Sequence, residues 1–163
     1  MMILKRVERR YLNNNILLSS SKSYRIALES VRQNIAGLNK HRQSLLSRVP
    51  HTNYWAKFKV NSITTKDLAF LSAASSDEFA LLRGKHEDIL FHGSRYHCEM
   101  DDVLIDLLIQ NKISLIAHTH VDCGILMPSK DDRIFLQTIN QKDSILVSAV
   151  DGKEITFSSG LFD

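Results

Sequence analysis

A short apolar run, Ile113 to Ala117, constrains the fold more than any other feature of this chain. A run of this length and character is typical of a strand buried on both faces in the centre of a sheet. Helical and strand-like patterns alternate around it between residues 63 and 163. The sequence therefore predicts a sheet domain of the α/β (α+β) class.

The remaining elements of this domain follow from capping and turn signals. Asp101 or Asp102 is placed to cap one helix, and Ser129, which follows Pro128, is placed to cap another. The elements expected, in chain order, are a helix over 68–74, a hairpin of strands over 78–83 and 88–92, a helix over 103–109, a helix over 130–139, and a last hairpin over 144–150 and 154–157.

Charge divides the chain into two parts, which the net charge of +3 conceals. Residues 1–50 contain ten Lys and Arg but two Asp and Glu, a balance of +8, whereas residues 51–163 contain eleven and sixteen, a balance of −5. We therefore expect two regions. Residues 1–62 form a basic helical N-terminal extension and a connector with a short strand, and residues 63–163 form the sheet domain.

The extension has the apolar spacing of one amphipathic helix. Its start is expected at Ser21 or Ser23, either of which can serve as an N-cap, and its end before Pro50. Such a helix packs on the sheet domain, on a second copy of the chain in a homodimer, or on a partner protein. Nucleic acid is not expected as a partner, because no aromatic residues are interleaved with the basic ones. The apolar positions are Tyr24, Leu28, Val31, Ile35, Leu38 and Leu45.

Several functional classes are excluded by composition. No run of eighteen apolar residues is present, so no membrane-spanning segment is expected. The apolar stretch from Ile16 to Leu18 is too short for the core of a signal peptide. Two cysteines, Cys98 and Cys123, are too few for a disulfide scaffold. We therefore expect a cytoplasmic protein with free thiols.

The polar residues that follow the central strand carry the chemistry. His118 and His120 are two residues apart, so both imidazoles project from one face at the carboxyl end of the strand, where open sheets bind ligands. Asp132 lies three residues after Ser129, in the first turn of the next helix, and faces back toward the loop. Two imidazoles and one carboxylate are three ligands for Zn²⁺ and leave a fourth position for water, as in catalytic zinc sites.

A zinc site of this kind needs a base. Glu78 is the best placed candidate, because it opens a strand of the preceding hairpin. Glu87, in the expected turn of that hairpin, and Glu99, just before a helix, are alternatives. His92 and His97 show no ordered spacing with other ligands, and their segment is expected to be exposed and polar.

Glu78, then His-x-His forty residues later, then Ser-x-x-Asp form a pattern that resembles the JAMM (MPN-plus) zinc metallopeptidase family over roughly residues 67–157. The resemblance implies a JAMM/MPN-like fold, a central mixed sheet flanked by helices that is similar in outline to that of the cytidine deaminases. It implies that His118, His120 and Asp132 hold one Zn²⁺ per chain. Glu78 is then the general acid/base for the attacking water, and Ser129 donates a hydrogen bond to the oxyanion.

The implied function is hydrolysis of an amide or isopeptide bond in a protein or peptide substrate, such as the tail of a ubiquitin-like or sulfur-carrier-like protein. The sequence departs from the family pattern where Val121 replaces a proline, and where eight residues rather than seven separate His120 from Ser129. Cys123, in this loop, is a small thiol or a supplementary zinc ligand. The alternative function is a catalytically silent JAMM-like module that binds a partner or nucleic acid through the basic helix. A zinc deaminase is disfavoured, because its Cys-x-x-Cys pair is absent.

Overall fold

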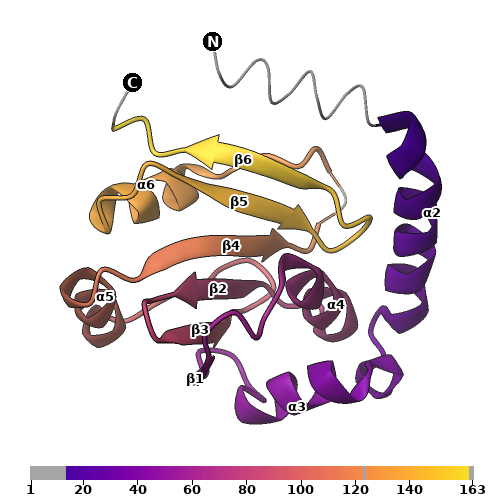
Figure 1. The fold of residues 1–163 in the computed structure, drawn as a ribbon, viewed down its shortest axis with the longest axis horizontal. Helices are drawn as coiled ribbons and strands as arrows, with labels where there is room; N and C mark the ends of the chain where they lie inside the picture. Colours follow the sequence, from indigo (N-terminus) through magenta and orange to yellow (C-terminus); the bar gives the residue numbers. More distant parts are fainter. Residues whose placement is uncertain (1–13, 123, 162–163) are drawn as a thin grey trace.

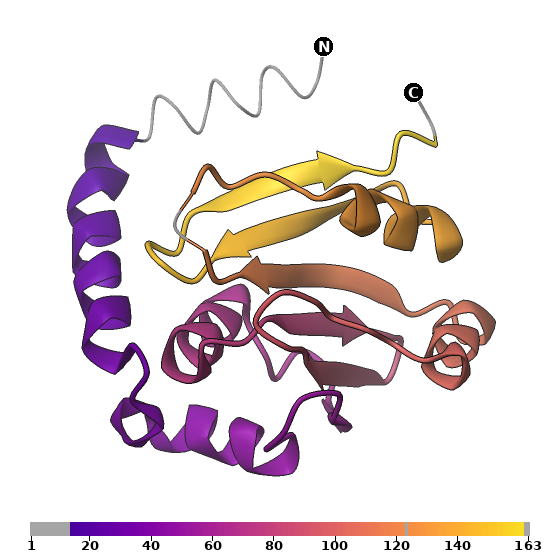
Figure 2. The same cartoon turned by 180° about the vertical axis from the view of Figure 1, so that it is seen from behind.

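The computed structural model describes residues 14–122 and 124–161, which form a six-stranded mixed sheet with helices on both faces (Figures 1 and 2). The strand order is β1-β3-β2-β4-β5-β6, and β4 and β5 are parallel whereas all other neighbours are antiparallel. β4, the strand expected at the centre, lies in the sheet interior, and the mixed α/β class is confirmed. The strands are β1 (Trp55–Lys59), β2 (Phe79–Arg83), β3 (Glu87–His92), β4 (Ser114–His120), β5 (Asp143–Ser148) and β6 (Glu154–Ser158).

Two hydrophobic cores hold the helices on the sheet, one on each face. Neighbouring residues of β2 alternate between them, because side chains of a strand point to opposite faces. Leu81 belongs to the core shared with α2, α3 and α4, whereas Ala80 and Leu82 belong to the core shared with α5 and α6. The α-helices of the described ranges are α2 (Asn14–Val31), α3 (Lys40–Arg48), α4 (Thr65–Ser75), α5 (Asp102–Gln110) and α6 (Lys130–Thr138).

Local capping residues fix where the helices of the sheet domain begin. Thr64 caps α4, Asp101 caps α5, and Ser129 caps α6. The helices and strands expected between residues 63 and 158 all occur, with ends that differ by at most three residues. No helix within residues 14–122 and 124–161 combines the length and the apolar character needed to cross a membrane.

The prediction of one continuous helix in the extension is wrong. α2 ends at Val31, because the N–H of Gln33 donates to the carbonyl of Ala73 in α4, and Gln33 adopts a left-handed φ of 53°. A 3₁₀ turn, η1 (Ile35–Gly37), follows, and α3 then begins at its own cap, Asn39. Ser21 and Ser23 lie inside α2 and are not its N-cap.

The extension packs on the sheet domain over much of its described length. Leu28, Val31 and Leu45 lie in the same core as α4. Tyr24 lies so close to Gly152, in the turn between β5 and β6, that a Cβ at this glycine would overlap the Tyr24 ring. The connector contributes β1, which pairs with β3 at one edge of the sheet. The basic extension is therefore one of the layers that cover the sheet.

The parallel pair β4 and β5 sets the position of the candidate site. α6 lies between these two strands in the chain, so a loop runs from the carboxyl end of β4 to the start of α6 (Figure 1). In units of this kind, ligands bind where the strand ends and the helix begins. His120 is the last residue of β4, and Ser129 is the N-cap of α6.

Candidate metal centre

The end of β4 presents two imidazoles on the same face of the sheet. His118 and His120 alternate with Thr119, whose hydroxyl donates to Ser72 of α4 on the opposite face. The ring of His118 packs edge-on against Phe157, with ring centroids 5.5 Å apart. The two imidazoles also lie edge to face, 5.2 Å apart. The period of two that predicted this arrangement is confirmed.

The third residue, Asp132, comes from the first turn of α6. Ser129 and Asp132 form a capping box: the Asp132 N–H donates to Ser129 Oγ over 3.0 Å, and the Ser129 N–H donates to Asp132 Oδ2 over 2.8 Å. This box turns the Asp132 carboxylate back toward the start of the helix. The start of α6 faces the end of β4, so the carboxylate meets both histidines.

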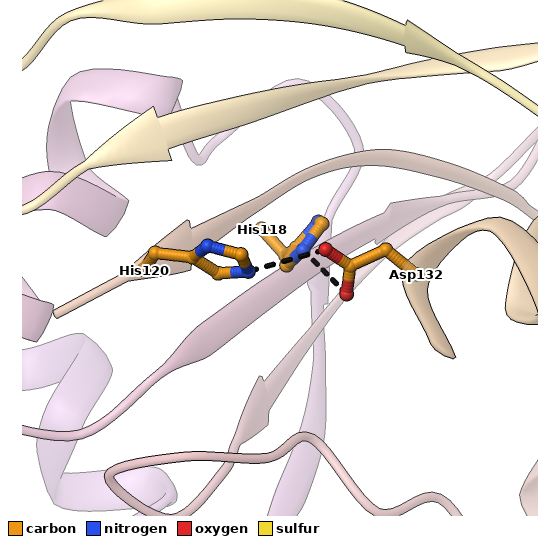
Figure 3. Close-up of side chains that lie close together, drawn as sticks. All are labelled: His118, His120 and Asp132. Carbon is orange, nitrogen blue, oxygen red and sulfur yellow. Dashed lines mark ion pairs between the residues drawn. The ribbon is translucent and has the colours of Figure 1, made fainter. Parts of the chain in front are cut away.

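The three side chains converge on one point (Figure 3). The distance from His118 Nε2 to Asp132 Oδ1 is 3.1 Å, and the distance from His120 Nε2 to Asp132 Oδ2 is also 3.1 Å. Donor atoms of the three residues all lie within 4.8 Å of one another. Ligand atoms placed about 2.0–2.1 Å from a tetrahedral metal ion are about 3.3 Å apart. The spacing therefore suits a single ion.

His118 lacks the hydrogen bonds that a buried imidazole normally makes. It is 5% exposed, and neither of its ring nitrogens forms a hydrogen bond within the described part of the chain. Nε2 lies 3.1 Å from Asp132 Oδ1, a contact that becomes an ion pair if the imidazole is protonated but that does not meet the geometry of a hydrogen bond. A buried polar atom left unpaired costs about 1–3 kcal/mol. A metal ion would satisfy this nitrogen, so these residues fit a metal ligand set.

The charges of the site favour a cation. Burial raises the pKa of Asp132, but the neighbouring imidazoles and the Ser129 N–H outweigh burial and hold that pKa far below its ordinary value. Burial lowers the pKa of His120, but the Asp132, Glu78 and Asp122 carboxylates outweigh burial and raise it. The site therefore attracts positive charge, which a metal ion would supply.

Glu78 lies beside this centre, at the entrance to β2. Ala80 pairs with His118 in the antiparallel register, so Glu78, two residues earlier, lies opposite His120 and on the same face. Glu78 is 8% exposed, and its carboxylate forms no hydrogen bond or ion pair with the residues that the structure describes. Burial raises the pKa of Glu78 from 4.5 to about 7, with a partly offsetting effect of His120.

The backbone around Glu78 is held on both sides. Its N–H donates to Ser94 O over 2.8 Å, and its carbonyl accepts from Gly93 N over 2.7 Å. Gly93 is required by this close approach, because a Cβ there would lie 2.8 Å from Cys98 Sγ and 3.0 Å from Glu78 O. The segment that follows β3 therefore sets the position of Glu78. No local sequence motif indicates this role of the segment.

A groove with a volume of about 950 Å³ contains the centre. The five residues predicted from the sequence all line it: Glu78, His118, His120, Ser129 and Asp132. The segment from Arg95 to Met100 forms another part of its wall, which sequence reasoning missed because no spacing rule connects this segment with β4. Cys123 lies outside the described residues.

The alternative acids and histidines have different environments. Glu87 is the first residue of β3 rather than part of a turn, and its carboxylate lies 3.6 Å from Lys57 Nζ. Glu99 is exposed at the groove. His97 lines the groove near it, whereas His92 is buried, so the prediction of an exposed segment is wrong at that residue. The reason is tertiary: the His92 ring stacks on Phe79, and its two nitrogens make hydrogen bonds with Val49 O and Asp77 Oδ2.

Comparison of the chain with family models, with curated proteins and with solved structures found no match. The resemblance to JAMM metallopeptidases therefore depends on the five residues named above and on the order of the elements that carry them. The functional conclusion has to come from the chemistry of the site.

Proposed function

We propose that this chain is a zinc-dependent metallopeptidase or isopeptidase of the JAMM type, which hydrolyses an amide or isopeptide bond in a protein tail. One observation carries the proposal. His118, His120 and Asp132 form a cation-attracting set that contains a buried imidazole without a hydrogen bond, and Glu78 is buried beside it.

Zinc is the metal that this donor set suits best. Two imidazole nitrogens and one carboxylate are typical of three-ligand catalytic zinc sites, whereas Mg²⁺ and Ca²⁺ prefer oxygen ligands alone. His118, His120 and Asp132 would hold the ion. When bound, zinc supplies a Lewis acid that polarises a carbonyl group and lowers the pKa of water.

Glu78 is suited to moving the proton. In the metal-free chain, burial raises the pKa of its carboxyl group to about 7, which favours gain and loss of a proton near neutral pH. The carboxylate can take a proton from the attacking water, and the acid can then give this proton to the leaving amine. Its side chain lies on the face of the sheet that carries His118 and His120, where the water and the scissile carbonyl would meet.

Ser129 is suited to binding the oxyanion. Its Oγ accepts the Asp132 N–H, which leaves the hydroxyl hydrogen free to donate. This hydroxyl lines the groove next to the Asp132 carboxylate. A fixed donor at this place stabilises negative charge that develops on the carbonyl oxygen in the transition state.

The order of elements supports a JAMM-like fold for the sheet domain. A strand entered through Glu78, a strand that ends in His-x-His and a helix that begins at Ser-x-x-Asp occur in that order, as β2, β4 and α6. The extra residue of the loop between His120 and Ser129 does not prevent the capping box from forming. The substrate we infer is a protein tail, of the kind found on ubiquitin-like or sulfur-carrier-like proteins.

The test compares metal content and hydrolysis in matched variants. We expect the purified chain to retain about one zinc, and His118→Ala to lose it. Glu78→Gln should retain zinc but hydrolyse a peptide or isopeptide substrate about 10²–10⁴-fold more slowly. Glu87→Gln is the control and should behave as the parent. A chain that never retains zinc would contradict the proposal, and a chain that retains zinc but hydrolyses nothing would favour the silent binding module.

A further inference from the structure

The groove has an apolar part next to the metal centre. Ile105 of α5, Ile134 of α6 and Leu115 of β4 line this part. Phe135 and Leu126 complete this part of the lining. Leu115 precedes His118 on β4 and belongs to the core shared with α5 and α6. An apolar compartment between two helices suits a large apolar side chain of a ligand.

The rim of the groove is acidic. Four carboxylates line it apart from those of the centre, namely Glu99, Asp102, Asp122 and Asp131, against one guanidinium, that of Arg95. Arg95 lies 3.8 Å from Asp122, whereas the other three carboxylates have no ion pair among the described residues. Asp102 and Asp131 belong to the first turns of α5 and α6, so both helices contribute acidic charge to the groove.

An acidic rim alone would not define a binding site, but a second feature of the same groove indicates a ligand. His118 is buried to more than nine-tenths, lines the groove, and has no hydrogen bond from either ring nitrogen within the described ranges. The metal centre and the apolar compartment are therefore parts of one cavity with an acidic rim. This combination complements a molecule that is both apolar and cationic.

We propose that the groove selects an extended polypeptide segment with a bulky apolar side chain next to the cleaved bond and Lys or Arg residues close by. The proposal rests on the function proposed above and specifies its substrate class. The carboxylates that line the groove without an ion pair attract basic residues and repel nucleic acids and acidic peptides. The charge of the groove thus distinguishes polypeptides by the sign of their flanking residues.

The first experiment tests charge. Four short peptides, with Leu or Ala at a central position and Lys or Glu at flanking positions, are incubated with the zinc-loaded full chain, and cleavage is followed by mass spectrometry. We expect the Leu/Lys peptide to have the highest kcat/KM, about tenfold above the Leu/Glu peptide. The double variant Asp102→Asn/Asp131→Asn should reduce this preference about threefold to tenfold. Asp106→Asn, an exposed acid of α5 outside the groove, is the matched control and should leave the preference unchanged.

The second experiment tests the apolar compartment. Ile134→Ala enlarges it and removes contacts, so the advantage of Leu over Ala peptides should fall about fivefold. Ile109→Ala removes a similarly exposed isoleucine of α5 that does not line the groove, and it should have no effect.

Binding separates this proposal from the proposed activity. The Glu78→Gln variant is titrated with the four labelled peptides, and binding is measured by fluorescence anisotropy. The groove assignment holds and the peptidase proposal fails if the zinc-loaded parent cleaves no peptide, but the Leu/Lys peptide binds best and Asp102→Asn/Asp131→Asn weakens that binding. Any of four results would overturn the groove assignment. In cleavage, these are equal rates for Lys and Glu peptides, or a preference that the double variant leaves unchanged. In binding, they are tighter binding of single-stranded DNA than of the peptides, or no binding of any peptide.

Discussion

Adjacent residues of β4, Thr119 and His118, point to opposite faces of the sheet and differ in their hydrogen bonds. Thr119 points toward α4 and is fully buried, and its hydroxyl both accepts the Phe79 N–H and donates to Ser72 Oγ. His118 points to the other face and is 5% exposed, yet it has no hydrogen bond among the described residues. Thr119 is therefore satisfied within the protein, whereas His118 leaves its ring nitrogens for a ligand.

Two buried histidines repeat this contrast. His92 lies on the side of α3 and α4, with Nδ1 at 2.6 Å from Val49 O and Nε2 at 2.8 Å from Asp77 Oδ2. His118 is similarly buried, but neither of its ring nitrogens forms a hydrogen bond within the described part of the chain, although Nε2 lies 3.1 Å from Asp132 Oδ1. Burial of a histidine therefore does not distinguish structural from metal-binding roles here. Hydrogen-bond partners do, because a polar group buried without them has to obtain its stabilisation elsewhere.

The largest expected effect is on zinc affinity. His118→Ala removes one of three ligands, so we expect the Kd for zinc to rise by more than about 100-fold. Isothermal titration calorimetry on metal-free protein measures this. His97→Ala, at another histidine that lines the groove, is the control and should keep the parent affinity. An unchanged Kd in His118→Ala would remove the basis of the comparison between the two faces.

The next effect is on stability and should differ between the two histidines. His92→Leu leaves Asp77 and the Val49 carbonyl without their partner, so we expect the free energy of unfolding to fall by about 3 kcal/mol. His118→Leu removes the 3.1 Å contact of Nε2 with Asp132 Oδ1 but no hydrogen bond, so the loss of stability in metal-free protein should be smaller, about 1 kcal/mol. Urea unfolding in the presence of a chelator measures both. Equal losses would show that His118 has structural partners after all.

Much of the fold could be predicted because its signals are local. The apolar run of β4, the hairpin of β2 and β3, and the caps Asp101 and Ser129 can each be identified within a few residues of sequence. The break after Val31 could not, because it depends on a hydrogen bond from Gln33 to Ala73 in another helix. Helix propensity over the extension contains no information about that contact.

The candidate site shows the same division. The two histidines and the Ser-x-x-Asp box were predictable from the periods of a strand and a helix start. The burial of His92 was not, because it depends on contacts with Val49 and with Phe79. The wall formed by Arg95 to Met100 was also missed, since only the tertiary fold brings it to the groove.

A smaller effect is expected from the pH dependence of Glu78. Its pKa is about 7 in the folded chain, whereas the ordinary value for a glutamate is 4.5, so folding favours the protonated acid. The stability that this group contributes is greatest below pH 4.5 and is lost as the pH rises through 7. In metal-free protein, Glu78→Gln should therefore exceed the parent in stability at pH 8 by on the order of 1–3 kcal/mol, and the gap should close as the pH falls toward the ordinary glutamate pKa. Thermal unfolding of both proteins at pH 8 and near pH 4.5 measures this. A difference in stability that widens at the lower pH would contradict the raised pKa.

The smallest expected effect concerns the residues that connect the two faces. Thr119 accepts the Phe79 N–H, and Ser72, which accepts from Thr119, donates to Asp77 O over 2.6 Å. Asp77 and Phe79, on either side of Glu78 in the sequence, are thus held by hydrogen bonds on the face of the sheet that packs against α4. Thr119→Val keeps the shape of the side chain but removes the hydroxyl, so stability should fall by about 1–2 kcal/mol.

Zinc affinity should not change in Thr119→Val, because the three ligands lie on the other face. The kcat of hydrolysis should fall more than KM rises, since only the position of Glu78 is affected. Thr119→Ser, which keeps the hydroxyl, should restore kcat. If Thr119→Val instead weakened zinc binding, the two faces would not be independent. The distinction between Thr119, which serves the structure, and His118, which binds a ligand, would then not hold for β4.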